Sequence, residues 1–387
     1  MENNQIKWAE INLDNLIHNM KEIRNHVGKE TKIAAVVKAN GYGHGALEIA
    51  EVLLENGADM LAVSSINEAV EIRKKFKKAQ TLVLGYTPTE NMEDAIRYGV
   101  IQTIYSYDQA EKYSRVAEKI GMGISFHIKV DSGMNRIGFM TDETSLRDII
   151  KISQLPNVKI NGIFSHFAVA DETDKSFSKT QYDRFIKFIN QLEKENIKVP
   201  IKHLANSAGI TDLPEMNMGM VRPGIILYGL YPSLDVNREN LRLKPVMSLK
   251  TRISHVKTLA ENGGISYGLK YRGKKGDKIA TIPIGYADGY TRLLSNKGEV
   301  LVKGKRAPVV GTICMDQCMI DVSEVEKIQV GDEVVLFGND GVNTISVEEV
   351  AEKIGTINYE IICMVGRRVP RVYIQNGEII KITDYLK

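Results

Sequence analysis

The sequence predicts an α/β fold, a (β/α)8 TIM barrel followed by a mostly-β domain. Over roughly the first 230 residues, short runs rich in β-branched side chains alternate with segments of helical spacing. Beyond about residue 240, strand-like runs follow one another with only Gly, Asp and Asn turns between them. The length of 387 residues also exceeds one ordinary hydrophobic core and favours two domains.

Eight apolar runs predict the barrel strands, because parallel strands covered on both faces are apolar almost throughout. In chain order they are residues 32–38, 60–65, 81–85, 101–106, 124–131, 160–167, 201–206 and 224–230. Helical spacing separates most of them, most clearly at residues 177–196 and also at 46–56 and 66–77. Such alternation is typical of a (β/α)8 barrel. A doubly wound open sheet is the alternative, although no G-x-G-x-x-G follows the first strand.

We expect the barrel domain to span residues 1–240 and the β domain to span residues 241–387. One helix is predicted in the second domain at residues 346–355, where Ser346 and Glu349 have the spacing of a capping box. The opening strand, about residues 6–13, precedes the first barrel strand and is a candidate to pair with the β domain.

Composition excludes several classes of protein. The net charge of +3 is too small to indicate a nucleic-acid partner. No apolar run of about 18 residues predicts a membrane span, and the first residues lack the features of a secretory signal. The three cysteines form no disulfide framework, and no second Cys pair or His near Cys314 and Cys318 indicates a metal site. We therefore expect a cytoplasmic protein without a metal ion.

The stretch "AAVVKANGYGHGA" places Lys38 at the end of the first predicted barrel strand. Active sites of such barrels lie at the C-terminal ends of the strands. Burial and neighbouring cations lower a lysine pKa, which makes the neutral amine available for a Schiff base or for proton abstraction. A structural lysine that reaches solvent is the alternative.

Other strand ends carry polar residues that suit an anionic ligand. Ser207 and Gly224 follow strands seven and eight, the corner where barrels commonly bind phosphate. Arg136, in "DSGMNRIG", suits a carboxylate that its guanidinium can grip with two hydrogen bonds. His166 and Arg222 also follow predicted strands, where a core histidine and a structural ion pair are the alternatives.

Taken together, these segments resemble the alanine racemase family. "VVKANGYGHGA" is similar to the family's pyridoxal-phosphate attachment segment, and "DSGMNRIG", "SHFAVAD", "HLANSAG", "VRPGIILYG", "SYGLKY" and "GTICMDQCMID" resemble family motifs in the same order. The resemblance covers essentially the whole chain. It implies a (β/α)8 barrel followed by a β domain, pyridoxal 5'-phosphate as cofactor, and a head-to-tail homodimer with two shared active sites.

The resemblance also implies roles for individual residues. Lys38 would bind the cofactor covalently and act as the base on one face of the substrate α-carbon, and Tyr267 of the second subunit would act on the opposite face. In the implied cofactor site Arg222 would meet the pyridine nitrogen, supported by His166. The full set of implied cofactor-binding residues is Lys38, Tyr42, His166, Asn206, Ser207, Arg222, Gly224, Ile225 and Tyr359.

For the substrate, the resemblance implies that Arg136 and the backbone of Met315 hold the carboxylate, Met315 coming from the second subunit. Lys129 matches a lysine that is carbamylated in the family and then orients Arg136. Tyr286 and Asp316 match positions at the entrance and on the partner's side of the site.

The expected function is the interconversion of L-alanine and D-alanine by two-base proton transfer on the cofactor, supplying D-alanine for peptidoglycan. A racemase of broader specificity, acting on serine or lysine, is the first alternative. A pyridoxal-phosphate amino-acid decarboxylase and a non-catalytic cofactor-binding protein are further alternatives. The expected partners are alanine and a second copy of the chain, with neither nucleic acid nor membrane.

Overall fold

The computed structural model describes residues 3–387, which divide into two compact units. The barrel unit contains Leu16–Gly41 and Ala46–Lys244, and the β unit contains residues 3–15, Tyr42–Gly45 and Pro245–Lys387. The glycine-rich segment after Lys38 is therefore divided between the two units.

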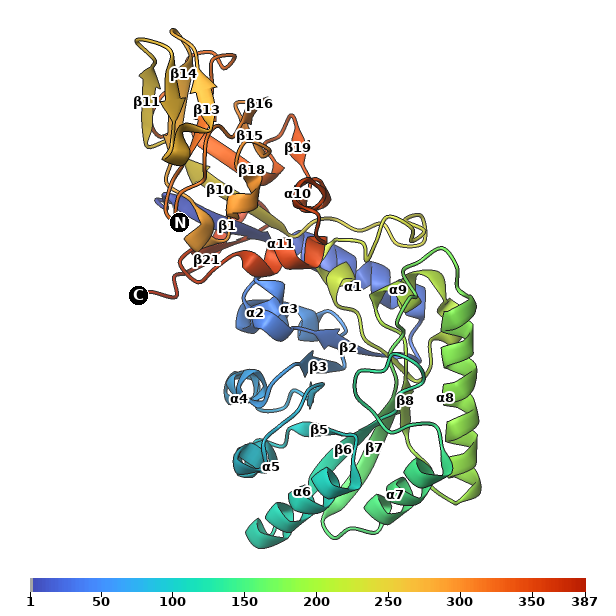
Figure 1. Ribbon diagram of the computed structural model, residues 1–387. Coiled ribbons are helices and arrows are strands. Elements are labelled where there is room, and N and C mark those ends of the chain that lie inside the picture. The colour runs from blue at the N-terminus through green and yellow to red at the C-terminus, as the bar shows by residue number, and fades with distance from the viewer. Residues whose placement is uncertain (1–2) are drawn as a thin grey trace. The chain divides into compact units, whose positions relative to one another are not determined.

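The barrel unit is built on eight parallel strands that close in sequence order (Figure 1). They are β2 (Lys32–Val36), β3 (Met60–Val63), β4 (Thr81–Val83), β5 (Ile101–Ile104), β6 (Ile124–Lys129), β7 (Val158–Phe164), β8 (Ile201–His203) and β9 (Met220–Val221). The barrel closes where Lys32 of β2 pairs with Met220 of β9. The predicted (β/α)8 barrel is confirmed, and the open doubly wound sheet is excluded.

One predicted strand is wrong. Residues 224–230 do not form the eighth strand; they contain the 3₁₀ helix η3 (Ile225–Tyr228), and the short β9 before it closes the barrel. All four residues of η3 are buried, so the segment is apolar on every side. Periodicity alone does not distinguish a buried strand from a short buried helix. Arg222 still lies directly after the last barrel strand.

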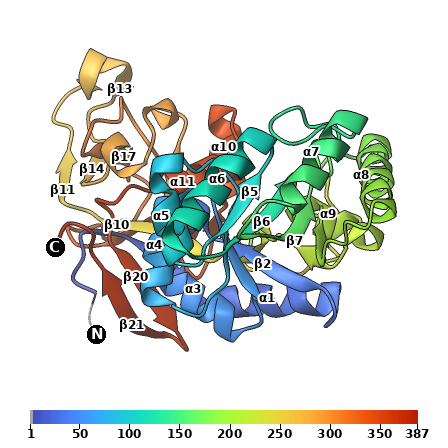
Figure 2. The same ribbon diagram turned by 90° about the horizontal axis from the view of Figure 1, so that it is seen from below.

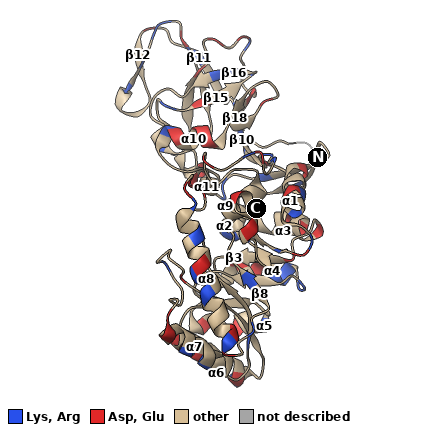
Figure 3. Cartoon of the chain, turned by 90° about the vertical axis from the view of Figure 1, so that its right-hand side faces the viewer, with Lys and Arg blue, Asp and Glu red and all other residues tan. Residues whose placement is uncertain are grey.

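Helices cover the outside of the barrel. In chain order they are α1 (Leu13–Val27), α3 (Ala46–Glu55), α4 (Ile66–Lys75), η1 (Thr89–Asn91), α5 (Met92–Arg97), α6 (Tyr107–Ile120), α7 (Glu143–Ser153), α8 (Ser176–Lys194), α9 (Ser207–Asp212) and η2 (Pro214–Met216). Both views place α7 and α8 on the outer side of β6 and β7 (Figures 1 and 2). The predicted apolar stripe of α8, which includes Phe185 and Leu192, is buried, and acidic and basic residues are interspersed along its length (Figure 3). Among the residues described, no helix is both long enough and apolar enough to cross a membrane.

The β unit is organised around one mixed sheet with the strand order β16-β15-β18-β10-β1-β20-β21, to which β19 adds beside β18. The opening strand β1 pairs antiparallel with β10 and parallel with β20. The members of this sheet are β1 (Lys7–Asn12), β10 (Met247–Arg252), β15 (Glu299–Val302), β16 (Lys305–Pro308), β18 (Glu333–Asn339), β19 (Thr344–Ile345), β20 (Arg371–Gln375) and β21 (Glu378–Thr383).

Smaller elements complete the β unit. They are the three-stranded sheet of β11 (His255–Thr258), β14 (Lys278–Ile282) and β17 (Cys318–Asp321), the hairpin of β12 (Gly263–Ile265) and β13 (Tyr271–Gly273), the 3₁₀ helices η4 (Tyr267–Leu269), η5 (Tyr286–Asp288) and η6 (Arg292–Leu294), and the helices α10 (Val347–Ile354) and α11 (Asn358–Met364). The predicted cap of α10 is present, because the Ser346 hydroxyl accepts a hydrogen bond of 3.0 Å from the Glu349 N–H. α11 was not predicted, since a seven-residue, mainly apolar segment carries little helical periodicity.

Candidate active site

Lys38 follows β2 at the C-terminal end of the barrel, and the backbone after it winds left-handed. The φ and ψ angles are 53° and 49° at Ala39, 52° and 47° at Asn40, and 62° and 45° at Gly41, so the segment labelled α2 (Lys38–Tyr42) is no ordinary helix. Left-handed conformation costs about 1–2 kcal/mol for each non-glycine residue. Strain of this kind is typical of functional sites, where surrounding contacts maintain it.

Two hydrogen bonds within the barrel unit hold this turn. The Ala39 N–H donates to Oε1 of Glu68 at 2.6 Å, and the Asn40 side-chain oxygen accepts from the Ala46 N–H at 2.9 Å. Asparagine tolerates the left-handed region better than most residues, which fits its place here. A Cβ at Gly41 would lie 2.4 Å from the Ile49 side chain, so an alanine at this position would require Ile49 to move.

Arg222 is a buried cation whose recorded hydrogen-bond acceptors are all uncharged. Nη1 donates to His203 Nδ1 at 2.8 Å, and Nη2 lies 3.0 Å from His166 Nδ1. Nη2 also donates to the carbonyls of Ser165 and Leu204, at 2.9 and 3.0 Å. Within residues 3–387 the structure records no acceptor for Nε of this side chain. Burial and the Arg136 charge lower the pKa of Arg222 to about 9.

Further titratable groups lie around this guanidinium. Burial, followed by the charges of Arg222 and Arg136 and opposed by Asp131, lowers the pKa of Lys129 to about 7. Burial and the charges of Arg222, Arg136, Lys129 and Lys38 hold the pKa of His166 well below its ordinary value. The C-terminal end of the barrel is therefore strongly electropositive and suits an anionic ligand.

The loop after β6 presents Arg136. Burial raises the pKa of Asp131, but backbone N–H groups of Gly133, Asn135 and Arg136 donate to its carboxylate at 2.8, 3.1 and 3.0 Å and bring the pKa below its ordinary value. The exposed guanidinium of Arg136 has no recorded hydrogen bond or ion pair within the part of the chain that the structure describes. It is thus positioned by its backbone and available to a substrate carboxylate.

The residues after β8 and β9 include several that are predicted to bind phosphate, and a hydrogen bond connects the two segments. The Ser207 hydroxyl accepts from the Gly224 N–H at 2.9 Å, and Asn206 caps α9 by accepting from the Gly209 N–H at 3.0 Å. Ile225 is buried. The barrel unit therefore brings together Lys38, Lys129, Arg136, His166, Asn206, Ser207, Arg222, Gly224 and Ile225 at the C-terminal ends of its strands.

Two other residues predicted to bind phosphate meet in the β unit. The rings of Tyr42 and Tyr359 have centroids 6.2 Å apart. Burial, with a smaller contribution from Cys363, raises the pKa of Tyr42, so its phenol stays protonated.

Tyr267 lies on an exposed and strained loop of the β unit. Its side chain is 73% exposed, and the flanking Ser266 and Leu269 have φ angles of 64° and 49°. Thr312 secures the loop: its hydroxyl donates to the Tyr267 carbonyl at 2.9 Å, and its carbonyl accepts from the Ser266 hydroxyl at 2.5 Å. The structure thus presents this phenol to the outside of a single chain.

The loop with Met315 belongs to the same unit. The Tyr286 N–H donates to the Cys314 carbonyl at 3.2 Å, and the Ala287 N–H donates to the Met315 carbonyl at 3.1 Å. Asp316 pairs with Arg368 at 2.7 Å. Met315 and Tyr286 are both exposed, and no acceptor is recorded among the described residues for the Met315 N–H.

Comparison with known proteins decides the family. Residues 11–232 match the family model "Alanine racemase, N-terminal domain", and residues 246–373 match "Alanine racemase, C-terminal domain". The chain belongs to the alanine racemase family. Its members are isomerases that interconvert the enantiomers of alanine and depend on pyridoxal phosphate, so the predicted family, reaction and cofactor are confirmed.

Individual relatives agree over the full length. Alanine racemase 1 of Clostridium acetobutylicum is 50% identical over 379 residues, covering 98% of both chains. The solved alanine racemase of Clostridium difficile has a TM-score of 0.96 at 45% identity and covers 100% of both chains. The Bacillus anthracis alanine racemase, solved with bound L-Ala-P, has a TM-score of 0.94 at 37% identity and covers 100% of this chain and 99% of that one.

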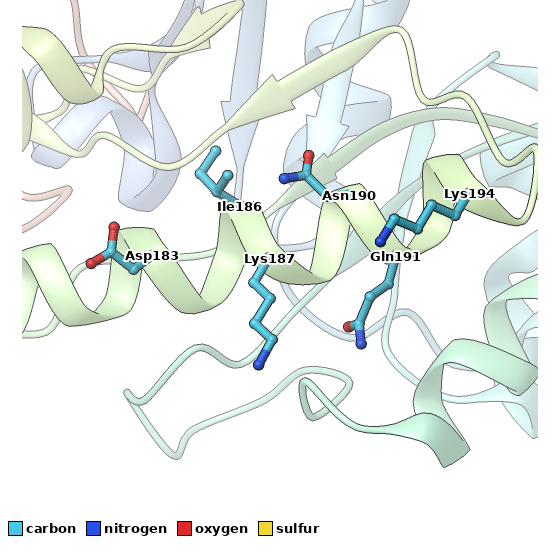
Figure 4. A pocket seen from close by; sticks show the side chains of 6 residues that line it. All are labelled: Asp183, Ile186, Lys187, Asn190, Gln191 and Lys194. Carbon is cyan, nitrogen blue, oxygen red and sulfur yellow. The ribbon is translucent and has the colours of Figure 1, made fainter.

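The residues of this alanine racemase fold fit pyridoxal phosphate. A pyridine nitrogen accepts one hydrogen bond, and Arg222 is a buried donor with no recorded acceptor for Nε. The phosphate and the substrate carboxylate are anions, and they would compensate Arg222 and Arg136, which have no recorded carboxylate acceptor among the described residues. Two pockets away from this end contain none of the predicted site residues. One lies near the first residues of β2, β3 and β9, at the opposite end of the strands, and the other is lined by α8 alone (Figure 4).

The sequence did not predict the side chains that support the site residues by hydrogen bonds. The motif "HLANSAG" contains His203, which accepts from Arg222, and the motif "DSGMNRIG" begins with Asp131, which holds the Arg136 loop. Neither residue had a predicted role. His127, which pairs with His203, also had none. A polar residue inside an otherwise apolar strand, as in "ISFHIK", was the available signal, because buried polar groups require partners.

Proposed function

We propose that this chain racemises alanine with two bases, Lys38 of one protomer and Tyr267 of the partner subunit, on opposite faces of the substrate α-carbon. The observation that carries the proposal is the electropositive barrel end, where Lys38 follows β2 and Arg222 is buried without a carboxylate acceptor. The exposed phenol of Tyr267 on its strained loop supports a second base that acts outside its own chain.

Bound pyridoxal phosphate supplies the electron sink that makes the α-proton of an amino acid removable. Lys38 would hold the cofactor covalently, and Ser207, Gly224, Ile225, Tyr42 and Tyr359 would bind its phosphate. Arg222 would donate to the pyridine nitrogen. Because a guanidinium donates its proton in the hydrogen bond without transferring it, that nitrogen would stay unprotonated.

The substrate carboxylate would lie between Arg136 and the backbone N–H of Met315 of the partner subunit. Lys129 would orient Arg136 as a carbamate. The pKa of about 7 supports this assignment, because only a neutral amine reacts with carbon dioxide and a large fraction of Lys129 is neutral near neutral pH.

A head-to-tail homodimer would complete each site. Tyr267, Tyr286 and Met315 are exposed by 73%, 42% and 53% on one chain. Hydrogen bonds from the N–H groups of residues 286 and 287 to the carbonyls of residues 314 and 315 hold the last two side by side. Exposed aromatic side chains and methionine are typical of an interface core before association.

We further propose a cytoplasmic enzyme that supplies D-alanine for peptidoglycan. Serine is the second substrate to test, since the carboxylate grip described above does not depend on the side chain of the amino acid.

The test uses L-alanine and D-alanine in deuterated water with purified holoenzyme, following chirality and α-deuterium separately. Wild type should racemise both and incorporate one deuterium per inversion. Tyr267→Ala should lose racemisation by a factor on the order of 10² or more, yet still exchange the α-proton of one enantiomer through Lys38. Tyr267→Phe is the matched control that keeps the ring and removes only the hydroxyl. Equal loss of exchange from both enantiomers would contradict two bases on opposite faces.

A further inference from the structure

A pair of buried histidines lies behind Arg222 in the barrel. His127 Nδ1 and His203 Nε2 are 3.0 Å apart, and His203 Nδ1 is 2.8 Å from Nη1 of Arg222. Phe164 stacks on the His203 ring at a centroid distance of 4.7 Å and an interplanar angle of 10°. Both histidines are fully buried, so the three side chains form a line of hydrogen bonds inside the barrel.

The protons along this line have a fixed order. A guanidinium only donates, so His203 Nδ1 accepts and its proton must be on Nε2. His203 Nε2–H then donates to His127 Nδ1, which places the His127 proton on Nε2. Burial and the Arg222 charge lower the pKa of His127 to about 3 and hold that of His203 well below its ordinary value, so both rings are neutral.

The strand beside His127 is shaped to receive its ring. The register between β6 and β7 shifts at this point: Phe126 pairs with Ile160, whereas His127 pairs with Gly162. A Cβ at Gly162 would lie 2.5 Å from Cε1 and Nδ1 of His127. Only glycine leaves room for the imidazole there, and the extra residue of the bulge aligns that glycine with it.

We propose that His127, placed by Gly162 and the bulge, is a positioning residue for Arg222. It acts through His203: by accepting a hydrogen bond from the Nε2–H it holds that ring with Nδ1 facing the guanidinium. Four neutral acceptors on Arg222, two histidine nitrogens and two carbonyls in place of a carboxylate, leave its charge uncompensated for the ligand. The inference rests on the proposed contact between Arg222 and the pyridine nitrogen.

The first measurement needs only wild-type holoenzyme, labelled with ¹⁵N-histidine. Nitrogen shifts and couplings should show His127 and His203 neutral, protonated on Nε2, and unchanged between pH 6 and 8. A proton on His203 Nδ1, or titration of either ring in this range, would overturn the proposal. Racemisation by the same preparation tests the proposed function separately.

The second measurement compares variants that keep or remove the acceptor for the His203 Nε2–H. His127→Asn keeps an acceptor near the position of Nδ1, whereas His127→Leu has none, and Gly162→Ala displaces the ring without altering it. We expect His127→Leu and Gly162→Ala to shift the absorption band of the bound cofactor and to lower kcat by on the order of tenfold, with KM for alanine little changed. His127→Asn should restore the band and most of kcat.

Folded His127→Leu protein with the band and kcat of wild type would refute the role of the histidine pair. Equal defects in His127→Asn and His127→Leu would also refute it, because the shape of the ring, and not its acceptor, would then be what matters. Should the leucine variant fail to fold, the Gly162→Ala spectrum and the wild-type nitrogen shifts still decide the question.

Discussion

At the scale of single residues, two arginines at the barrel end have no recorded carboxylate partner among the described residues. Arg222 donates to two histidine nitrogens and two carbonyls, and Arg136 is fixed by its backbone while its guanidinium remains exposed. Burying a cation such as Arg222 without a carboxylate partner is unfavourable for stability. A bound anion would offset that cost, so the burial of Arg222 favours the binding of an anionic ligand.

Lys129 gives a prediction at this scale. Its pKa is lowered from 10.5 to about 7, so the neutral amine gains population as the pH rises through 7. At a fixed concentration of dissolved ¹³CO₂, a carbamate signal in the ¹³C spectrum should therefore increase between pH 6 and 8. Lys129→Gln should abolish this signal and raise KM for alanine on the order of tenfold, because Arg136 loses its orientation.

Lys129→Arg is the matched control, since it keeps a cation at this position but cannot form the carbamate. A carbamate signal of equal size in Lys129→Gln would assign the modification to another amine. A signal that grows about tenfold per pH unit up to pH 8, without levelling off, would contradict the lowered pKa.

At the scale of elements, tight backbone contacts fix the loop after β6, which contains Arg136. The loop after β6 returns on itself, so that Val130 and Phe139 form an isolated bridge and Gly138 lies against Asp131. Such a loop behaves as one rigid part, because the Asp131 carboxylate binds three of its N–H groups.

Gly138→Ala tests that rigidity. Its φ is +138°, and a Cβ would lie 2.5 Å from the Asp131 nitrogen, a backbone atom that cannot move aside cheaply. We expect Arg136 to be displaced and KM for alanine to rise on the order of tenfold or more, measured by steady-state kinetics in both directions. Gly28→Ala is the matched control, since Gly28 also has a positive φ, +77°, but nothing lies within 4 Å of its Cβ position.

Gly28→Ala should cost about 1–2 kcal/mol of unfolding free energy, measured by urea denaturation, without changing KM. Equal effects of the two substitutions on KM would show that the Gly138 contact has no part in placing Arg136.

At the scale of the whole molecule, we propose that each site combines two chains. Tyr267, Tyr286 and Met315 belong to the β unit, whereas Lys38 and Arg222 belong to the barrel unit. A head-to-tail dimer would give two equivalent sites, each combining the barrel residues of one copy with the β-unit residues of the other.

Mixing inactive variants tests this arrangement. Lys38→Ala and Tyr267→Ala should each lose racemase activity by a factor on the order of 10² or more. After the two are unfolded together and refolded, mixed dimers carry one intact site and one doubly defective site, so activity should recover to about a quarter of wild type.

The control pairs Lys38→Ala with the double variant Lys38→Ala/Tyr267→Ala, a mixture in which no intact site can form and no recovery is expected. Absence of recovery in the first mixture, although mixed dimers are present by native mass spectrometry, would show that both bases come from one chain.

The sequence by itself determined the barrel, the following β-rich region and the position of Lys38 at a strand end. These features follow from local patterns, because strand and helix periodicity and turn residues act over a few positions. It also placed the candidate site residues through motifs, with Arg222, His166 and Ser207 each near the end of a strand. Their roles as bases and ligands remain predictions.

Only the tertiary structure decided which apolar run closes the barrel and which side chains support the candidate site. β9 is two residues long, and the longer apolar run after it is a buried 3₁₀ helix, a choice made by packing on all sides. His127 and His203 are 76 residues apart, yet barrel closure sets their nitrogens 3.0 Å apart. Hydrogen bonds between distant strands depend on register and on a bulge next to Gly162, and no local pattern in the chain specifies either.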